Sequence, residues 1–195
     1  MRISVIGAGN VGSVLARRLT ETGHDVATAN TATPVAKVVA QVSAAELVVL
    51  AVPFAAVAGL DEAVKAALAG KIVVDATNPL AADFMSLTVG HTTSGGEQVA
   101  AALPGATVVK AFNSVFAGRL GEPDSVGGTL FLPVAGDDEA ARKTVVELGA
   151  QLGFDAVDVG PLANARYMEP VIELLIQIAY GKGMGADIGL VLTRK

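Results

Sequence analysis

The stretch Gly7-Ala8-Gly9-Asn10-Val11-Gly12 decides the fold of this chain. It follows the apolar run 3–6 and opens a helical pattern at 11–22. A strand, a glycine turn and a helix in this order form the context that the dinucleotide-binding fingerprint G-x-G-x-x-G requires. Gly7 permits the tight turn, Gly9 lets backbone approach a pyrophosphate, and Gly12 lets the helix pack closely on the strand. We therefore predict that Gly7, Gly9, Asn10, Val11 and Gly12 bind a dinucleotide at the helix N-terminus.

Two other interpretations of this stretch are weaker. A secretory leader needs an uninterrupted apolar segment and small residues at its cleavage site, but Asn10 interrupts the run and Arg17-Arg18 follow it. The second alternative is a glycine turn that binds no ligand.

The chain has no cysteine, which excludes disulfides and thiolate catalysis and suits a reducing compartment. We expect a cytoplasmic protein.

Composition excludes several classes of partner. The chain is 52% hydrophobic and 17% charged, yet its most apolar segment, 47–60, is broken by Pro53 and Gly59 and falls short of the ~20 residues that span a bilayer. A net charge of −5 provides no basic surface for nucleic acid. No metal-ligand spacing is present. We expect no membrane, nucleic-acid or metal partner.

Short β-branched runs alternate with helical patterns, which predicts successive βαβ units. The expected class is α/β, a Rossmann-type doubly wound, mostly parallel sheet with a short C-terminal helical extension. We place the NAD(P)-binding domain at 1–160 and the extension, packed on the same domain, at 161–195. The expected strands are Arg2–Ile6, Asp25–Ala29, Leu47–Ala51, Ile72–Asp75, Thr107–Ala111, Leu130–Ala135 and Ala156–Val159. The expected helices are Val11–Thr22, Val35–Val42, Asp61–Ala69, Gly96–Leu103, Asp138–Leu152 and Ala163–Tyr180.

The end of the second strand bears on the choice of nicotinamide cofactor. NAD-specific sites usually place an acidic residue there, roughly 20 residues after the motif, to bind the ribose hydroxyls. This chain has Asn30, Thr31 and Thr33 instead, and Lys37 lies one turn into the helix that begins at Pro34. Hydroxyl donors and free helix N–H groups suit a 2′-phosphate, so we predict NADP(H). In the alternative interpretation, Thr33 only caps the helix and Lys37 is a solvated charge.

The carboxyl ends of the central strands are where ligands of this fold lie. Ala51, Val52 and Pro53 follow the third strand and are expected to wall the cofactor, although Pro53 also fits a purely structural role at a helix start.

Candidate catalytic residues are few and mostly uncharged. Thr77, Asn78 and Asn113 follow neighbouring strands and are able to hold an amide or a ring edge, or only to tie down their own loops. His91 lies in the long connection 78–93, where it either approaches substrate or is solvated. Lys110 ends a strand and is either an anion ligand or a surface charge.

This lack of acid–base groups favours one kind of chemistry. Reduction of a carbonyl or an imine normally needs a proton donor, whereas hydride transfer between two stacked rings proceeds through positioning. The sequence thus favours a flavin-like or deazaflavin acceptor. We expect the connection 78–93 and the glycine-rich segment 181–185 to cover it.

A series of motifs in fixed order resembles a known family along nearly the whole chain. The family is that of the NADPH-dependent deazaflavin (coenzyme F420) reductase-like, dinucleotide-binding enzymes. The resemblance implies a Rossmann domain with a small C-terminal extension, NADPH binding, hydride transfer to or from a deazaflavin, and commonly a homodimer. The motifs are Gly7–Gly12, Ala51–Pro53, Asp75–Pro79, Val109–Asn113, Ala135–Asp138, Gly160–Leu162, Ala165-Arg166, Glu169-Pro170 and Ala179–Gly181.

The chain departs from the family at one point, because characterised members tend to show Ser-Arg where this sequence has Asn30-Thr31. Members related to metalloreductase domains use flavin, so the family leaves the small-molecule hydride acceptor open. Two further functions also stay open: an NADP(H)-binding redox sensor that reports through a partner, and a reductase of a small imine or carbonyl substrate.

Overall fold

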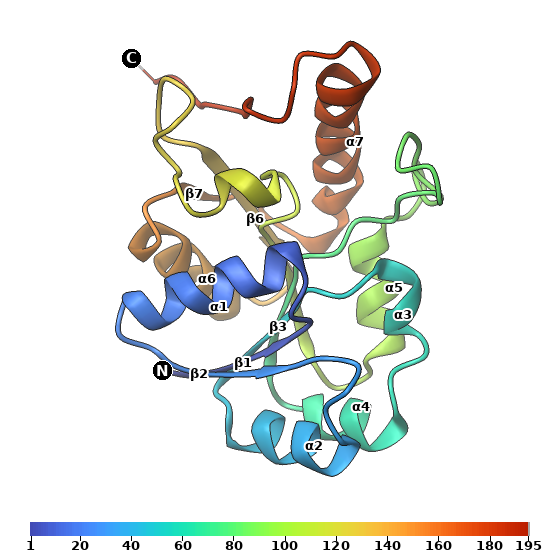
Figure 1. Ribbon diagram of the computed structural model, residues 1–195. Helices are drawn as coiled ribbons and strands as arrows, with labels where there is room; N and C mark the ends of the chain where they lie inside the picture. The colour runs from blue at the N-terminus through green and yellow to red at the C-terminus, as the bar shows by residue number, and fades with distance from the viewer. Residues whose placement is uncertain (195) are drawn as a thin grey trace.

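The computed structural model describes residues 1–194, which form a seven-stranded sheet with helices on both faces (Figure 1). The strand order is β2-β1-β3-β4-β5-β6-β7. Within the described residues, every neighbouring pair is parallel except β5 and β6. The doubly wound, mostly parallel Rossmann-type sheet expected from the sequence is thus confirmed. The strands are β1 (Arg2–Ile6), β2 (Asp25–Ala29), β3 (Leu47–Leu50), β4 (Ile72–Asp75), β5 (Thr107–Lys110), β6 (Phe131–Gly136) and β7 (Asp155–Asp158).

The helices divide between the two faces of the sheet. Apolar side chains of α1 and α6 pack on one face, and those of α2, α4 and α5 pack on the other. A short helix, α3, is not among the expected helices, although Pro53, which directly precedes it, fits the expected role at a helix start. The helices are α1 (Asn10–Glu21), α2 (Val35–Ala44), α3 (Phe54–Val57), α4 (Glu62–Leu68), α5 (Gly95–Ala102), α6 (Glu139–Gln151) and α7 (Ala165–Ile176).

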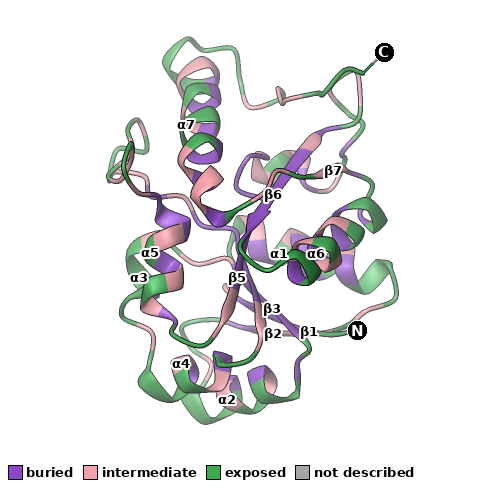
Figure 2. Ribbon diagram, turned by 180° about the vertical axis from the view of Figure 1, so that it is seen from behind, coloured by how far each residue is buried: buried purple, intermediate pink, exposed green. Residues whose placement is uncertain are grey.

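Strand β3 shows why the central strands read as unbroken apolar runs. Leu47 and Val49 belong to the core cluster on the α1 face, while Val48 and Leu50 belong to the cluster on the α2 face. All four side chains are buried, as the purple strands of Figure 2 show. Both faces of a covered parallel sheet exclude water, so hydrophobic side chains are required at every position and not at alternate ones.

Strand β6 enters the sheet from the opposite direction to β5. The connection between them holds a short 3₁₀ turn, Ala117–Arg119, and β6 then pairs with β5 only through its last residues, with Ala135 opposite Lys110. The first half of β6 therefore extends beyond the carboxyl end of β5, where it pairs with β7. This geometry places Phe131 and Pro133 past the carboxyl edge of the parallel strands.

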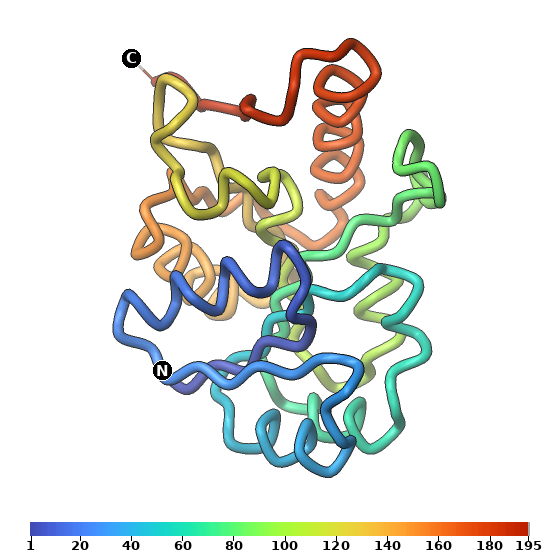
Figure 3. The backbone as a smooth tube through the Cα atoms, in the orientation of Figure 1, coloured from blue at the N-terminus to red at the C-terminus, as the bar shows by residue number. Residues whose placement is uncertain are grey.

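The C-terminal segment lies on the same side of the molecule as the first half of β6. The expected helix 163–180 is divided into α7 and a π-helical turn, Gln177–Gly181. The tail then returns beside the start of β6, where the Phe131 N–H donates to the Leu190 carbonyl at 2.8 Å (Figure 3).

Among the described residues, no helix is long and apolar enough to cross a membrane. The division into units 1–160 and 161–195 stays a prediction.

Candidate active site

A cleft of about 660 Å³ lies at the carboxyl ends of β1, β2 and β3. Helix α1 leaves β1 on one face of the sheet, whereas α4 follows β3 on the other. Ligands of open α/β sheets bind at such a switch point. The sequence-predicted residues that line the cleft are Gly7, Gly9, Asn30, Thr31, Thr33, Ala51, Val52 and Pro53.

The three motif glycines meet different surroundings. Gly7 has a φ of +110°, and a Cβ built on it would lie 2.2 Å from the Ala51 carbonyl oxygen. A Cβ on Gly12 would lie 1.8 Å from the Gly7 carbonyl oxygen. At Gly9, by contrast, no described atom outside its immediate neighbours comes within 4 Å of the built Cβ. Gly7 and Gly12 are therefore required by packing, and Gly9 leaves the cradle beside the helix open.

The first turn of α1 is free to bind an anion. Gly9 is the N-cap residue, and within residues 1–194 no side chain caps the helix. Asn10 and Val11 are the first helical residues, and backbone N–H groups at these positions have no intrahelical acceptor. The first turn also lacks an acidic residue. The positive end of the helix dipole and these N–H groups suit a pyrophosphate.

The loop after β2 forms a closed turn at the rim of the cleft. The Asn30 N–H donates to the Thr33 hydroxyl at 3.0 Å, and the Ala32 N–H donates to Asn30 Oδ1 at 2.9 Å. Thr33 Oγ1 also contacts Asn30 Oδ1 at 3.3 Å, so its hydroxyl is engaged within the turn. Thr31 is exposed and lines the cleft. Of the two predicted hydroxyl donors, Thr33 is therefore engaged within the turn, and Thr31 is the more exposed one at the cleft.

The structure does not bring Lys37 to this cleft. Its side chain lines a separate groove of about 310 Å³ together with Arg2, Asp25 and Gln41, beside the amino end of β2. Position 37 lies in the first turn of α2, where its side chain is exposed.

Three of the four predicted catalytic residues come together at the ends of β4 and β5. Asn78 Nδ2 donates to the Asn113 carbonyl at 3.1 Å, and Asn113 Nδ2 donates to Asn78 Oδ1 at 3.0 Å. Thr77 and Asn113 are buried. Thr77 Oγ1 and Asn113 Oδ1 have no hydrogen-bond partner among the described residues. Buried polar atoms are almost always paired, so these two unpaired oxygens mark a candidate polar site at the strand ends.

The backbone before Asn113 is strained. Phe112 has a φ of +66°, the left-handed region that bulky L residues rarely adopt. Its ring is buried and packs edge to face on Phe154, with ring centroids 6.0 Å apart. Strain of this kind is concentrated at functional sites, where the surrounding packing maintains it. Here it redirects the chain after β5, so that Asn113 turns back toward Asn78.

A buried ionic cluster, which was not predicted from the sequence, lies beneath these residues. Lys110 Nζ lies 2.9 Å from Asp75 Oδ2, 2.6 Å from the Thr77 carbonyl oxygen and 3.1 Å from Glu169 Oε1. The carboxylate of Glu169 also accepts from the backbone N–H groups of Gly95 and Gly96 at the start of α5. All three charged side chains are at most 1% exposed.

This cluster decides the role of Lys110. An ammonium group has three N–H donors, and three protein oxygens are within reach of them. Lys110 is therefore neither a surface charge nor a free anion ligand. The sequence contained one indication of this cluster. Asp75 and Lys110 are charged residues that each end an apolar strand, and the two residues are register partners in the sheet. Glu169 stood out only as part of the motif Glu169-Pro170, and its pairing with Lys110 could not be predicted because it lies in a separate helix.

His91 lies apart from the other three predicted catalytic residues. The connection 78–93 packs against α7 through Leu80 and Met85, and its expected place over the ends of β4 and β5 stays a prediction. His91 is exposed and lines a groove with Arg166 and Tyr167. The segment 181–185, also expected to cover the site, lies at the far end of α7 (Figure 1).

Comparisons with known proteins agree with this geometry. Residues 2–79 match the family model described as "NADP oxidoreductase coenzyme F420-dependent". The chain is 34% identical to the F420-dependent NADP reductase of Methanocaldococcus jannaschii over 151 residues, which cover 73% of this chain and 67% of that protein. It is also 32% identical to the metalloreductase STEAP3 of Rattus norvegicus over 184 residues, 87% of this chain. The chain spans 36% of the length of that metalloreductase.

A solved structure is similar over the full length. The crystal structure of a putative F420-dependent NADP reductase from Arthrobacter sp. FB24 has a TM-score of 0.88 and 31% identity, and the match covers 100% of both chains. The whole fold, including the antiparallel β6 and the C-terminal helix, therefore falls within this structural comparison.

Proposed function

Because the chain belongs to the family of coenzyme F420-dependent NADP oxidoreductases, we propose that it is an enzyme that transfers hydride between NADP(H) and a deazaflavin or flavin-like acceptor. The observation that carries this proposal is the open cradle at Gly9, which faces the switch-point cleft. Bound NADPH would supply the hydride, which is one proton with two electrons, and would leave as NADP⁺. A proton from water completes the reduced acceptor.

The residues present suit NADP(H). The N–H groups at the start of α1, with Gly9, Asn10 and Val11, would hold the pyrophosphate. The first turn of α2 has no side-chain cap among the described residues, and Thr31 lies beside it. Together they would hold the 2′-phosphate without an arginine. Val52 and Pro53 would wall the cofactor, and Lys37 takes no part in this site.

The chemistry of the site follows from the absence of a free acid or base at the ends of β4 and β5 in the described chain. Lys110, Asp75 and Glu169 are engaged with one another. Thr77, Asn78 and Asn113 offer neutral oxygens and amides that would orient the carboxamide or a ring edge. Positioning of two rings requires no proton transfer from the protein, which supports a deazaflavin or flavin over a carbonyl or imine.

Steady-state oxidation of NADPH tests the proposal. Coenzyme F420, FMN, FAD and ferric chelates are offered as acceptors in parallel, and we expect turnover with F420 or a flavin. Tight NADPH binding without turnover on any of them would overturn the enzymatic proposal in favour of a redox sensor. Turnover only with an imine or a carbonyl compound would overturn the choice of acceptor.

A homodimer formed through α7 belongs to the same proposal. Tyr167, Val171 and Leu174 lie at spacings of four and three residues on this helix, and they are 72%, 38% and 60% exposed. Apolar side chains at such spacings form one stripe on a helix. A contiguous exposed apolar stripe is typical of a protein interface.

A further inference from the structure

Both backbone polar groups of Thr77 are held by the buried ionic cluster. The Thr77 N–H donates to Asp75 Oδ1 at 2.9 Å, and Lys110 Nζ donates to the Thr77 carbonyl oxygen at 2.6 Å. Lys110 Nζ also lies 2.9 Å from Asp75 Oδ2, so the two charged side chains form one clamp around this residue. Asp75 and Lys110 are register partners in neighbouring strands. The pairing of β4 with β5 therefore fixes the two halves of the clamp.

The clamp decides where the next N–H points. The described chain contains no cis peptide bond, and the C=O and N–H of a trans peptide point in opposite directions. Since the Thr77 carbonyl oxygen faces Lys110, the N–H of Asn78 points away from the cluster. Among residues 1–194 this N–H has no hydrogen-bond acceptor. A reversed peptide would leave the buried ammonium without one of its three oxygen partners, which is costly.

Three polar groups without a partner among the described residues thus belong to the loops that follow β4 and β5. They are the Asn78 N–H, Thr77 Oγ1 and Asn113 Oδ1. The Asn78 and Asn113 side chains join the two loops through a hydrogen bond of 3.0 Å. One donor and two acceptor oxygens are the complement of a primary carboxamide, which has one acceptor oxygen and two N–H donors. The carboxamide of a nicotinamide ring is such a group.

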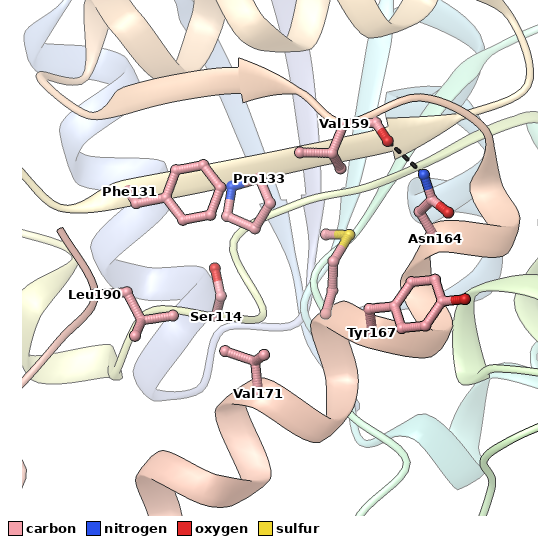
Figure 4. A pocket seen from close by; sticks show the side chains of 9 residues that line it. Ser114, Phe131, Pro133, Val159, Asn164, Tyr167, Val171 and Leu190 are labelled. Atoms are coloured by element: carbon pink, nitrogen blue, oxygen red, sulfur yellow. Dashed lines mark hydrogen bonds between the residues drawn. The ribbon is translucent and has the colours of Figure 1, made fainter. Parts of the chain in front are cut away.

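Lys110 itself does not reach a ligand. Its side chain is 0% exposed, and it lines neither the switch-point cleft nor an apolar pocket of about 350 Å³ between β6 and α7. Figure 4 shows this pocket, with Ser114 and Val171 among its lining side chains. Met168 lines it as well, whereas the next residue, Glu169, contacts Lys110. Any effect of Lys110 on a ligand must therefore pass through the peptide that it holds.

We propose that Lys110 is a positioning residue, which together with Asp75 holds the Thr77–Asn78 peptide in one orientation. The Asn78 N–H then donates to the carboxamide oxygen of the nicotinamide, and Thr77 Oγ1 and Asn113 Oδ1 accept from its amide N–H groups. This inference rests on the proposed function and gives the buried charges a part in it. A fixed carboxamide fixes the plane of the ring from which hydride leaves, and rate depends steeply on that geometry.

Two ligands that differ by the nicotinamide test the assignment. NADP⁺ and 2′-phospho-ADP-ribose share the phosphates that the cleft would bind, but only NADP⁺ carries the carboxamide. Lys110→Met should raise the Kd of NADP⁺ about five- to tenfold, the contribution of one hydrogen bond, and leave the Kd of the fragment unchanged. Calorimetry measures both affinities. If both Kd values rise together, or if neither changes, Lys110 does not position the carboxamide.

Glu169→Gln is the matched control within the same cluster. Glu169 contacts Lys110 and the first N–H groups of α5, and its described contacts do not include Thr77. This variant should lower the unfolding temperature but keep the ratio of the two affinities at its wild-type value. A cluster with a purely structural role would change the ratio alike in both variants, and that result would overturn the inference.

A measurement on the wild type keeps the inference testable if Lys110→Met does not fold. Hydrogen exchange of the Asn78 N–H, followed by NMR, should be slowed by NADP⁺ and not by the fragment. Equal exchange with the two ligands would contradict the assignment.

The outcomes also separate this inference from the proposed function. If NADP⁺ binds as described but no acceptor is reduced by NADPH, the proposed function fails and the positioning role stands. If wild type turns over and Lys110→Met keeps the wild-type affinity ratio, the positioning role fails and the function stands. A wild type that does not bind NADP⁺ would overturn both.

Discussion

At the scale of single residues, the cleft depends on three glycines. A side chain at any of these positions would contact either the protein or a bound ligand. Gly7 and Gly12 contact backbone so closely that a Cβ does not fit, whereas Gly9 faces open space. Glycine is therefore required for close backbone packing at Gly7 and Gly12, whereas at Gly9 it would let a ligand approach the backbone. Substitutions at these positions separate stability from binding.

We predict that Gly9→Val abolishes NADPH binding and leaves the protein folded, because its side chain would fill the cradle without meeting described protein atoms. Calorimetry measures the affinity and thermal unfolding the stability. Gly12→Ala is the contrasting variant: its Cβ would lie 1.8 Å from the Gly7 carbonyl oxygen, so it should lower the unfolding temperature. Unchanged NADPH affinity in Gly9→Val would remove the basis of the dinucleotide site.

The rim of the cleft yields a second prediction. Thr31→Arg places a guanidinium beside the proposed 2′-phosphate and should tighten NADPH binding by about 1.5–3 kcal/mol, the contribution of a hydrogen bond to a charged group. Lys37→Ala is the control and should leave the affinity unchanged, because Lys37 lines a different groove. A wild-type preference for NADH would contradict the placement of the phosphate at Thr31.

At the scale of elements, buried and partly buried charges attach α7 to the rest of the fold. Glu169 of α7 meets both Lys110 of β5 and the first N–H groups of α5. Nearby, Arg166 donates to both carboxylate oxygens of Glu97 in α5. Helix α7 is thereby fixed beside the strand ends that hold Thr77 and Asn113.

Removal of one charge from the buried cluster should destabilise the protein. Lys110→Met leaves Asp75 and Glu169 facing each other without a cation, and breaking a buried pair in this way costs about 3–5 kcal/mol. Urea unfolding measures this loss. Arg17→Ala, which breaks the exposed pair with Glu21, should cost less than about 1 kcal/mol. Equal losses for the two variants would show that the buried cluster adds nothing beyond a surface pair.

The contact between α5 and α7 should also depend on pH. The hydrogen bonds from Arg166 hold the pKa of Glu97 below its usual value of 4.5. A carboxyl whose folded pKa is depressed stabilises the fold above the unfolded pKa, and this contribution is lost as pH falls through the lower folded pKa. Glu97→Gln should therefore be less stable than wild type at pH 7, and the difference should shrink below about pH 4.5. A difference independent of pH would exclude this ion pair as its cause.

At the scale of the whole molecule, β6 and α7 add an apolar pocket of about 350 Å³ to a dinucleotide fold, lined by Phe131, Pro133, Met168 and Val171 among others. The switch-point cleft lies at one part of the carboxyl edge, and the apolar pocket lies two strands beyond β4 on the same edge. The exposed stripe of α7 lies next to this pocket, since Tyr167 and Val171 belong to both.

The proposed dimer is tested by changing the residue of the stripe that does not line the pocket. Leu174→Asp should convert a dimer into a monomer, because a charge cannot be buried in an apolar interface without a partner. Light scattering measures the mass in solution. Lys143→Asp, on α6 at the opposite side of the sheet, is the control and should leave the mass unchanged. A monomeric wild type would overturn the dimer.

The sequence by itself determined the dinucleotide half of this protein. A strand, a glycine turn and a helix follow one another within a few residues, so local pattern predicts β1, α1 and the cleft residues from Gly7 to Pro53. The reason is that each feature depends on neighbours in the chain. Three predicted strands match the observed ones and the other four differ by one residue at one or both ends, which is within the range over which such boundaries vary.

Only the tertiary structure decided the rest. The direction of β6, the meeting of Asp75, Lys110 and Glu169, and the pocket at Ser114 all join residues far apart in the sequence. No local periodicity encodes which helix supplies the partner of a buried lysine. Packing selects that partner, because a buried charge must find an opposite charge wherever the fold brings one.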